Sequence, residues 1–600
     1  MIGSELQKQV SRARSNNARP LALFLTFSVF AHGLYFPQER IIFGFALSGY
    51  ILLSYSWYRR FKMDTGTSSA FGLTDALLLG MFWLSIFGVL HPVKVIDGLI
   101  EALEWGIFWL AYRLGNRISS DITAKEHLAR SVEGLALIVA IIGWLPWVNR
   151  VEGRLSSVFG YPNATAAFLG AALLLHPRRL SVRIFLGISL LGTGSRAGVG
   201  LFLVVFGGQQ LLSWLRSHRK SPILAIRQRL QTREKGTGHR LREQCVIALG
   251  ITGFVFMLLY YKPAWENLTA WGFSSLSWQE RLAYFRDGIN LAWKAGGYPR
   301  AGGWMAFPTV QHVPYWTADP HSSFIHILLN QGVLGILSLG IWSCYLLVHI
   351  WKTWKMKLLK AQLQVGGALL FLALHSLVDA DFSFGALGLL FWLLFGGVQQ
   401  RNEHPSPLLF KRDKLAINLG KKGVLGLSLT LCLACGSSLV NPALLEQEKS
   451  WNTQARHWLE QDPDKSIVLW NRSLNWDQTQ IGTRREQAEF LLRQGDSNSG
   501  LKAVEEVLNW QPLDLATYEW AQSAVWDAAE VQRYTQRKTA AVFYHWVEDV
   551  PQKIEGKVNN LTVVERLLWK NYRSFQPPEH IKLLADYARR RQLTQPPPRT

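Results

Sequence analysis

The feature that most constrains this sequence is a series of long apolar runs that fills its first three quarters. Most of these runs have about 17–25 residues, the length that a helix needs to cross the hydrocarbon core of a bilayer. Inside that core the backbone has no water to bond, and a helix satisfies its polar groups within the segment. The last quarter of the 600 residues is polar and has no such run. The sequence therefore predicts an all-α protein, with a polytopic membrane helix bundle over residues 20–445 and a soluble helical domain over residues 446–600.

The apolar runs predict about 12–13 transmembrane helices. They lie near residues 20–36, 41–57, 71–90, 96–112, 128–147, 164–175, 182–193, 199–215, 245–261, 323–350, 365–378, 384–398 and 424–440. The first run resembles a signal peptide only in its position, because no small-residue cleavage site follows it. We therefore predict a signal anchor, preceded by a basic arm over residues 1–19 that stays in the cytoplasm.

The distribution of positive charge predicts the orientation. The net charge is +22, but the lysines and arginines sit mostly in short loops between apolar runs, not in a basic groove with interleaved aromatic residues, so we expect no nucleic-acid partner. Cytoplasmic loops of membrane proteins are rich in Lys and Arg. Strict alternation assigns to the cytoplasm five basic loops, at residues 113–130, 177–183, 216–242, 352–360 and 401–414. The amino terminus is then inside, and the long loop at residues 262–322 and the C-terminal domain are outside.

The four cysteines favour neither a disulfide framework nor a zinc site, because all of them lie in or beside apolar segments. They are Cys245, Cys344, Cys432 and Cys435. The pair Cys432 and Cys435 is superficially similar to a lipoprotein box, but it lies inside the last predicted crossing. We interpret it as helix packing, and we predict no metal site.

Two short outward segments carry polar residues beside predicted crossings. In the segment 154–164, Asn163 follows Pro162 at the start of a helix, where it either caps the free amides or contacts substrate. In the second segment, Arg196 lies between two apolar runs and is flanked by small residues. An arginine at that depth is costly unless it is paired, and it more often marks a binding site. The planar guanidinium group matches two phosphate oxygens, so phosphate is its expected partner.

The long external loop supplies a third set of polar residues, which includes Arg281 and His321. His321 lies where the chain re-enters an apolar run. A histidine at the mouth of a membrane segment can accept a proton near neutral pH, or it can be an interfacial residue that water satisfies. The loop alone leaves both interpretations open.

The three segments together, in this order, resemble the O-antigen ligase and polymerase superfamily of the bacterial envelope. The resemblance covers about residues 20–398. Four motifs carry it: Arg154-x5-Gly160-Tyr161-Pro162-Asn163; Ser195-Arg196-Ala197-Gly198; Gln279-Glu280-Arg281-Leu282, which is similar to a family arginine before a helix; and Gly302-Gly303-Trp304 followed by Pro320-His321-Ser322-Ser323-Phe324-x7-Gly332-Val333-Leu334-Gly335. Two departures are Tyr161, where the family usually has Asn, and Gly302-Gly303 in place of Gly-x-Gly.

The resemblance implies a glycosyltransferase in the bacterial cytoplasmic membrane, independent of metal, nucleotide and any other cofactor. It would transfer a glycan from an undecaprenyl-pyrophosphate carrier, held in membrane lipid, to an acceptor glycan, lipid or protein. His321 would be the catalytic base, while Arg196, Arg281 and Arg154 would neutralise the departing pyrophosphate. Further residues are expected, with less support, to bind substrate: Asn163, Ser195, Ser322, Asp379 and Asp381.

The pair Asp379 and Asp381 is similar to the Asp-x-Asp of nucleotide-sugar transferases, which use it to hold a metal and a nucleotide. Nucleotide sugars are cytosolic, whereas the alternation places this pair outside. We prefer a helix-end or loop feature, with glycan contact as the alternative.

The C-terminal segment reads as amphipathic helices separated by Pro, Gly or Asp turns, and Leu508–Asp514 resembles the end of a tetratricopeptide unit. Such a TPR-like domain would cap the outer face or dock an acceptor or a protein partner. For the whole chain, alternatives to a ligase are a polymerase of lipid-linked repeat units, a lipid-linked glycan transporter and a scaffold. A transporter would show ionisable residues along the interior of its crossings, whereas the charges here concentrate at the outward mouth.

Overall fold

The computed structural model describes residues 18–60, 71–119, 121–148, 150–218, 266, 269, 276–315, 319–355, 360–398 and 414–593. Throughout these ranges the regular secondary structure is helical, and no β-strand occurs in them beyond two isolated bridges. The predicted all-α fold is confirmed. The basic arm at residues 1–17 and the predicted crossing at residues 245–261 lie outside the described residues.

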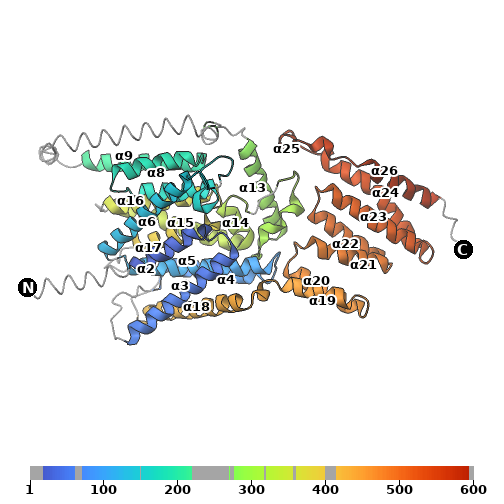
Figure 1. Ribbon diagram of the computed structural model, residues 1–600, viewed down its shortest axis with the longest axis horizontal. Helices are drawn as coiled ribbons and strands as arrows, with labels where there is room; N and C mark the ends of the chain where they lie inside the picture. Colours follow the sequence, from blue (N-terminus) through green and yellow to red (C-terminus); the bar gives the residue numbers. More distant parts are fainter. Residues whose placement is uncertain are drawn as a thin grey trace, which may run out of the picture.

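The first three quarters of the chain form a helical bundle (Figure 1). Its helices are α2 (Ala18–Phe30), α3 (Pro37–Arg60), α4 (Leu73–Gly88), α5 (Val95–Arg117), α6 (Ile122–Trp144), α7 (Pro162–Leu174), α8 (Leu180–Gly192), α9 (Arg196–His218), α14 (Ser323–Asn330), α15 (Gly332–Lys355), α16 (Lys360–Ser376), α17 (Gly385–Val398) and α18 (Lys414–Val440). Three segments are long and apolar enough to cross a membrane by length and composition: Ile122–Trp144, Arg196–Leu215 and Leu419–Val440.

The centre of the bundle consists of helices that are buried on all sides. α5 is buried along nearly its whole length and packs along α17, and α7 is also buried throughout. Small residues let the backbones of α5 and α17 approach closely. A Cβ atom at Gly115 would collide with the carbonyl of Leu393, and one at Gly396 would collide with that of Tyr112. The core therefore depends on shape as well as on apolar character.

The predicted continuous helix at residues 323–350 is wrong, because the chain breaks between α14 and α15. Gly332 has φ 68°, a left-handed conformation that side chains rarely adopt and that ends one helix before the next begins. The amide of Val333 donates to the carbonyl of Gly297 at 3.0 Å. The break therefore ties α14 to the segment that precedes it.

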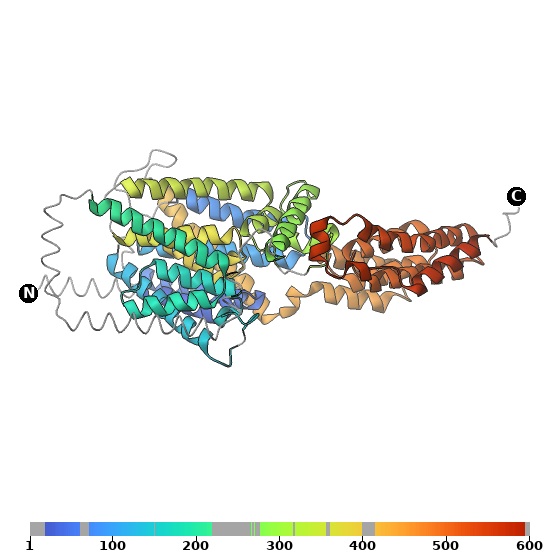
Figure 2. The ribbon, with the colours of Figure 1, turned by 90° about the horizontal axis from the view of Figure 1, so that it is seen from above.

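The described part of the predicted external loop contains regular structure. It includes α13 (Leu276–Lys294) and a 3₁₀ helix, η3 (Gly303–Val310). Both pack against the C-terminal helices and share one hydrophobic cluster with them. In Figure 2 this segment lies between the bundle and the elongated C-terminal part.

The C-terminal part is built from helices that pack with their sequence neighbours. They are α19 (Gln447–Trp458), α20 (Pro463–Trp476), α21 (Ile481–Arg493), α22 (Ser497–Trp510), α23 (Leu515–Gln532), α24 (Arg537–Asn559), α25 (Val563–Leu568) and α26 (Glu579–Leu593). Several polar links hold them to the rest of the chain, on two sides. The amide of Gln478 donates to the carbonyl of Val93 at 2.7 Å, and Arg286 of α13 pairs with Glu565 of α25 at 2.5 Å.

At the end of the bundle away from the C-terminal helices, the ends of several other helices lie together. α5 begins beside the C-terminal part, where Lys94 pairs with Asp477, and it ends at Arg117. At that far end a cavity of about 370 Å³ is lined by residues from the start of α6, the turn after α7, the start of α16 and the end of α17. Lys125, Arg130 and Arg178 are among them. Described residues of two of the loops predicted to be basic, 113–130 and 177–183, thus meet at this end.

Candidate functional site

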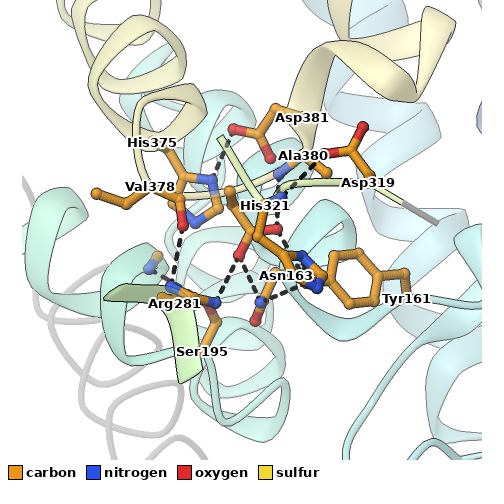
Figure 3. A network of polar contacts seen from close by, with 12 residues as sticks. Tyr161, Asn163, Ser195, Arg281, Asp319, His321, His375, Val378, Ala380 and Asp381 are labelled. Atoms are coloured by element: carbon orange, nitrogen blue, oxygen red, sulfur yellow. Dashed lines mark hydrogen bonds and ion pairs between the residues drawn. The ribbon is translucent and has the colours of Figure 1, made fainter. Parts of the chain in front are cut away.

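A buried carboxylate, that of Asp379, is the centre of a polar network at the end of the bundle nearest α13 (Figure 3). It accepts hydrogen bonds from the Tyr161 hydroxyl at 2.9 Å, the Asn163 amide at 2.6 Å and the Arg281 guanidinium at 3.0 Å. The backbone amide of Ala380 donates a fourth bond at 2.9 Å. Four donors on one carboxylate satisfy most of its acceptor capacity. The network joins residues that are far apart in the sequence.

The start of α7 explains how two of these donors reach Asp379. Pro162 occupies the first turn of the helix, where its missing N–H is no loss. Tyr161, just before it, is extended, and its side chain makes no capping bond. The Asn163 side chain also turns away from the helix amides, toward Asp379 and Arg154. Of the two predicted roles for Asn163, the structure therefore excludes capping and shows a network contact.

Backbone carbonyls and side chains hold the guanidinium groups of Arg154 and Arg281 in place. The Nε of Arg154 donates to the carbonyl of Thr193 at 2.9 Å, and its Nη2 donates to the Asn163 side chain at 2.7 Å. The Nη1 of Arg281 donates to the carbonyl of Val378 at 2.9 Å. The motif resemblance predicted that Arg281 precedes a helix, but the structure places it within α13. Its position in the second turn brings it against the end of α16.

The electrostatic balance of the network is positive. Arg196, the first residue of α9, is half-buried, and its charge interacts with that of Arg281. Burial lowers the pKa of the Arg154 guanidinium, and the nearby charge of Arg281 lowers it further. Burial would raise the pKa of Asp379, but Arg281 and the other positive groups lower it below its usual range, and the carboxylate stays ionised. Arg154 and Arg281 both interact with the charge of Asp379, and Arg196 adds a third positive charge beside Arg281, an arrangement that favours an added anion.

His321 lies beside this network in a strained conformation. Its φ is 51°, which a residue with a side chain adopts at a cost of roughly 1 kcal/mol or more. Its backbone amide donates to the Asp319 carboxylate at 3.0 Å, and this bond fixes the turn that leads into α14. The ring lies near those of Tyr161 and Tyr284, with centroids 6.2 and 5.5 Å away. Strain of this kind is concentrated at functional sites.

The contact between His321 and Tyr161 constrains the protonation of the imidazole. Nδ1 lies 3.4 Å from the Tyr161 hydroxyl oxygen, a long contact. The hydroxyl has one proton, which it donates to Asp379, and its oxygen can then only accept from the ring. Such a contact requires the proton of neutral imidazole on Nδ1. The lone pair then resides on Nε2, the atom that can accept a proton.

A second set of polar residues, which the sequence analysis missed, adjoins the first. The Asp319 carboxylate accepts a bond from the Ser383 hydroxyl and lies 3.2 Å from Nδ1 of His326. The other nitrogen of His326 lies 3.2 Å from Glu101 of α5. Burial raises the pKa of Asp319, but bonding and charge from His326 outweigh it, and the pKa lies below its usual range. The available signal was Glu101, an acidic residue within an apolar run.

The remaining predicted residues have internal partners. The Ser195 hydroxyl accepts a bond from the amide of Gly198 at 3.2 Å at the start of α9, and Ser322 accepts one from the amide of Ile325 at the start of α14. Asp381 pairs with His375 at 2.6 Å. Of the nine predicted site residues, the polar contacts join five in one network: Arg154, Asn163, Arg281, Asp379 and His321. Ser195, Ser322 and Asp381 make local bonds, and Arg196 is linked to the network by its charge interaction with Arg281.

The chemistry that the described residues offer is anion binding next to a proton acceptor. Across the described part of the chain, no group of three or more His, Cys, Asp or Glu is arranged to hold a metal ion. No protein-family model matches this chain, and none of the curated protein sequences matches it either.

Proposed function

We propose that this protein is a membrane glycosyltransferase that moves a glycan from a polyprenyl-pyrophosphate carrier to an acceptor hydroxyl, as O-antigen ligases do. One observation carries the proposal. The guanidinium group of Arg281 binds Asp379, Arg154 joins it through Asn163, and Arg196 lies close enough to interact with the charge of Arg281. His321 lies beside them, with a ring nitrogen 3.4 Å from the Tyr161 hydroxyl. Pyrophosphate is the leaving group that such a cluster stabilises best.

The reaction needs only groups that are present on this chain and its substrates. The acceptor hydroxyl attacks the anomeric carbon of the donor sugar as the bond from that carbon to the phosphate oxygen breaks. His321 takes the hydroxyl proton, and the arginines take up the negative charge that the departing pyrophosphate gains. Attack from the face opposite the leaving group inverts the anomeric centre. The ion pair with Asp379 orients Arg281 before substrate arrives, which reduces the reorganisation needed.

The fold supports a polytopic membrane protein of the predicted orientation. Twelve of the thirteen predicted crossings contain helix in the described residues, and the thirteenth lies outside them. Described residues of two basic loops, 113–130 and 177–183, meet at the end of the bundle away from the C-terminal helices, as positive-inside bias predicts for the cytoplasmic face. The network around Asp379 then opens on the outer side, where a lipid-linked glycan is available.

The C-terminal helices support the proposed TPR-like domain, since α19 pairs with α20, α21 with α22 and α23 with α24. We assign it to the outer face, where its links to α13 hold the site segment against the bundle. A docking role toward a protein or acceptor partner belongs to the same proposal.

The deciding experiment mixes purified protein with a polyprenyl-pyrophosphate glycan and an acceptor extract, with chelator present and no nucleotide added. Transfer is expected for the parent and lost for His321→Ala, while donor binding is kept. His312→Ala is the matched control, because His312 is an exposed histidine of the same loop outside the network. Equal rates for His321→Ala and the parent would remove His321 from the mechanism. A requirement for nucleotide sugar would refute the assignment.

A further inference from the structure

A cavity of about 240 Å³ adjoins the network and is lined by Asp319 and Ser383. Asp319 is the link between the two, because its carboxylate also accepts the backbone amide of His321. Gly302 and Trp304, from a motif that the proposed mechanism leaves without a role, line the same cavity. Its volume is several times the share of one water molecule and accommodates a ligand about the size of one sugar ring.

The apolar part of the lining is aromatic. Rings from four separate segments contribute to it: Tyr35, Trp105, Trp304 and Phe382. The face of an aromatic ring is electron-rich, and it attracts groups with partial positive charge. The C–H groups on the flat face of a pyranose ring are such groups, and their hydroxyls at the ring edge remain available for hydrogen bonds. Aromatic walls with few polar groups therefore suit a sugar better than a lipid chain or a phosphate.

The polar part of the lining includes three carboxylates, those of Asp97, Glu101 and Asp319. His326 also lines the cavity and lies 3.2 Å from both Glu101 and Asp319, which leaves the carboxylates part of their acceptor capacity. Arg40, a cation in the lining, is engaged elsewhere, since it pairs with Glu104 at 3.0 Å and donates to the carbonyl of Ser383 at 2.5 Å. Carboxylates accept bonds from sugar hydroxyls and repel anions. The cavity thus differs in charge from the arginine-rich network beside it.

One buried side chain in the lining lacks a partner. The Ser323 hydroxyl is buried, with 7% of the residue exposed, and it has no hydrogen-bond partner among the described residues. A buried polar group without a hydrogen bond is destabilising, so each one calls for an explanation, and a bound ligand is one. Because Ser323 lines the cavity, a ligand hydroxyl there can supply the missing bond.

We propose that this cavity binds the terminal sugar ring of the acceptor glycan, and that this sugar is neutral or carries an amino group. The inference rests on the proposed function and adds to it the class of acceptor. The donor pyrophosphate occupies the arginine-rich network, and the acceptor ring lies on the other side of Asp319. Asp319 then contacts both the acceptor sugar and the turn that holds His321.

Ligand-observed saturation-transfer NMR on the full chain in lipid nanodiscs tests this directly. The probes are methyl glucoside, methyl glucosaminide and methyl glucuronide. The first two are expected to bind the parent and the third, which is anionic, to bind much more weakly. Met305 lies at the cavity wall and is half-buried, so Met305→Trp fills the space. That variant is expected to lose sugar binding, while Met305→Leu, the matched control, keeps it. Ser323→Ala should weaken binding by roughly three- to tenfold, since it removes one hydrogen bond.

The outcomes separate this inference from the proposed function. Glycoside binding that Met305→Trp leaves unchanged, or glucuronide binding as strong as that of the glucoside, would overturn the sugar assignment. His321 does not line the cavity, so His321→Ala should bind methyl glucoside as the parent does. If that binding pattern holds while no variant transfers glycan, the transferase proposal fails and the sugar site stands. If transfer occurs and Met305→Trp has the parental KM for acceptor, the sugar site alone fails.

Discussion

The Nη2 of Arg281 lies 3.0 Å from a carboxylate oxygen of Asp379, although the two residues are 98 positions apart. This ion pair holds α13 against the end of α16, and Asp379 is fully buried. A buried charge that loses its partner is costly, because the remaining charge is desolvated without compensation. The pair therefore serves both stability and the orientation of Arg281.

Asp379→Ala is expected to lower stability by about 3–5 kcal/mol, since it leaves Arg281 without its counter-charge. Asp379→Asn keeps the shape and should be milder. The measurement is thermal unfolding of the purified protein in detergent, with Asp586→Ala as control because Asp586 is exposed in α26. If Asp379→Ala unfolds at the same temperature as Asp586→Ala, the ion pair has no structural role.

Arg281→Lys and Arg196→Lys should each reduce kcat/KM for transfer by on the order of a hundredfold. Lysine keeps the charge but loses the planar fork that matches two phosphate oxygens. Arg178→Lys, at the opposite end of the bundle and largely exposed, is the matched control. Parental activity in both Arg281→Lys and Arg196→Lys would exclude a bidentate pyrophosphate contact.

Tyr161→Phe removes one hydroxyl that contacts Asp379, Asn163 and His321. We expect the transfer rate to fall by about tenfold to a hundredfold, because the imidazole loses the contact that fixes its proton on Nδ1. Tyr284→Phe is the control, since its ring also lies beside His321. The measurement is the pH profile of kcat. A profile and a rate equal to those of the parent would show that Tyr161 does not influence His321.

The contact between Arg286 and Glu565 predicts how acid affects the C-terminal helices. Burial raises the pKa of Glu565, but bonds from Thr562 and Arg286 outweigh it, and the pKa lies below the usual 4.5. A carboxyl whose folded-state pKa is lowered stabilises the fold above its unfolded-state pKa. That stabilisation is lost as the pH falls through the lower, folded-state value. The contact should persist at pH 5–7 and weaken only in stronger acid.

Hydrogen–deuterium exchange of residues 563–568 can follow this. Glu565→Gln should exchange faster than the parent at neutral pH, by a small factor because Arg286 is 40% exposed and the pair is partly screened. In the parent, acid should increase the exchange rate of these residues, and Glu565→Gln should lose that increase. Glu519→Gln, at a partly exposed glutamate of α23, is the control. A parental acid response in Glu565→Gln would place the titrating group elsewhere.

Gly332→Ala should impair both folding and activity, because its φ of 68° is unfavourable for alanine and a Cβ would collide with the carbonyl of Gly297. Backbone strain alone should lower the free energy of unfolding by about 1 kcal/mol, and the collision with Gly297 should lower it further. Gly340→Ala lies eight residues further along α15, with open space around its Cβ, and should be neutral or slightly stabilising. Similar melting of the two variants would contradict the close contact.

Local patterns predicted those parts of the site that depend on chemistry within a short segment. Arg196, Arg281 and His321 were recognisable because charged residues beside apolar runs are unusual and costly. The sequence pattern favours a helix-end or loop role for Asp379, whereas in the structure its carboxylate is the centre of the network. Its donors are up to 218 residues away, and such contacts depend on how the helices pack, which no local spacing reveals.

The same contrast between local patterns and tertiary contacts applies to the fold. Apolar periodicity predicted the helices, but not the break at Gly332 or the helix around Arg281, because both depend on tertiary contacts. The acidic residue Glu101 was read as part of a membrane crossing. Its partners, Asn330 and His326, come from a helix more than two hundred residues later.

The C-terminal helices have a consequence for the order in which the protein matures. They are synthesised after the bundle, yet they hold the turn at Val93 and the helix that carries Arg281. A nascent chain that stops before Gln478 contains Arg281 and His321, but it lacks the contacts that hold their supporting segments in place. Under the proposed function, the site should therefore become competent for transfer only after these helices have folded against the bundle.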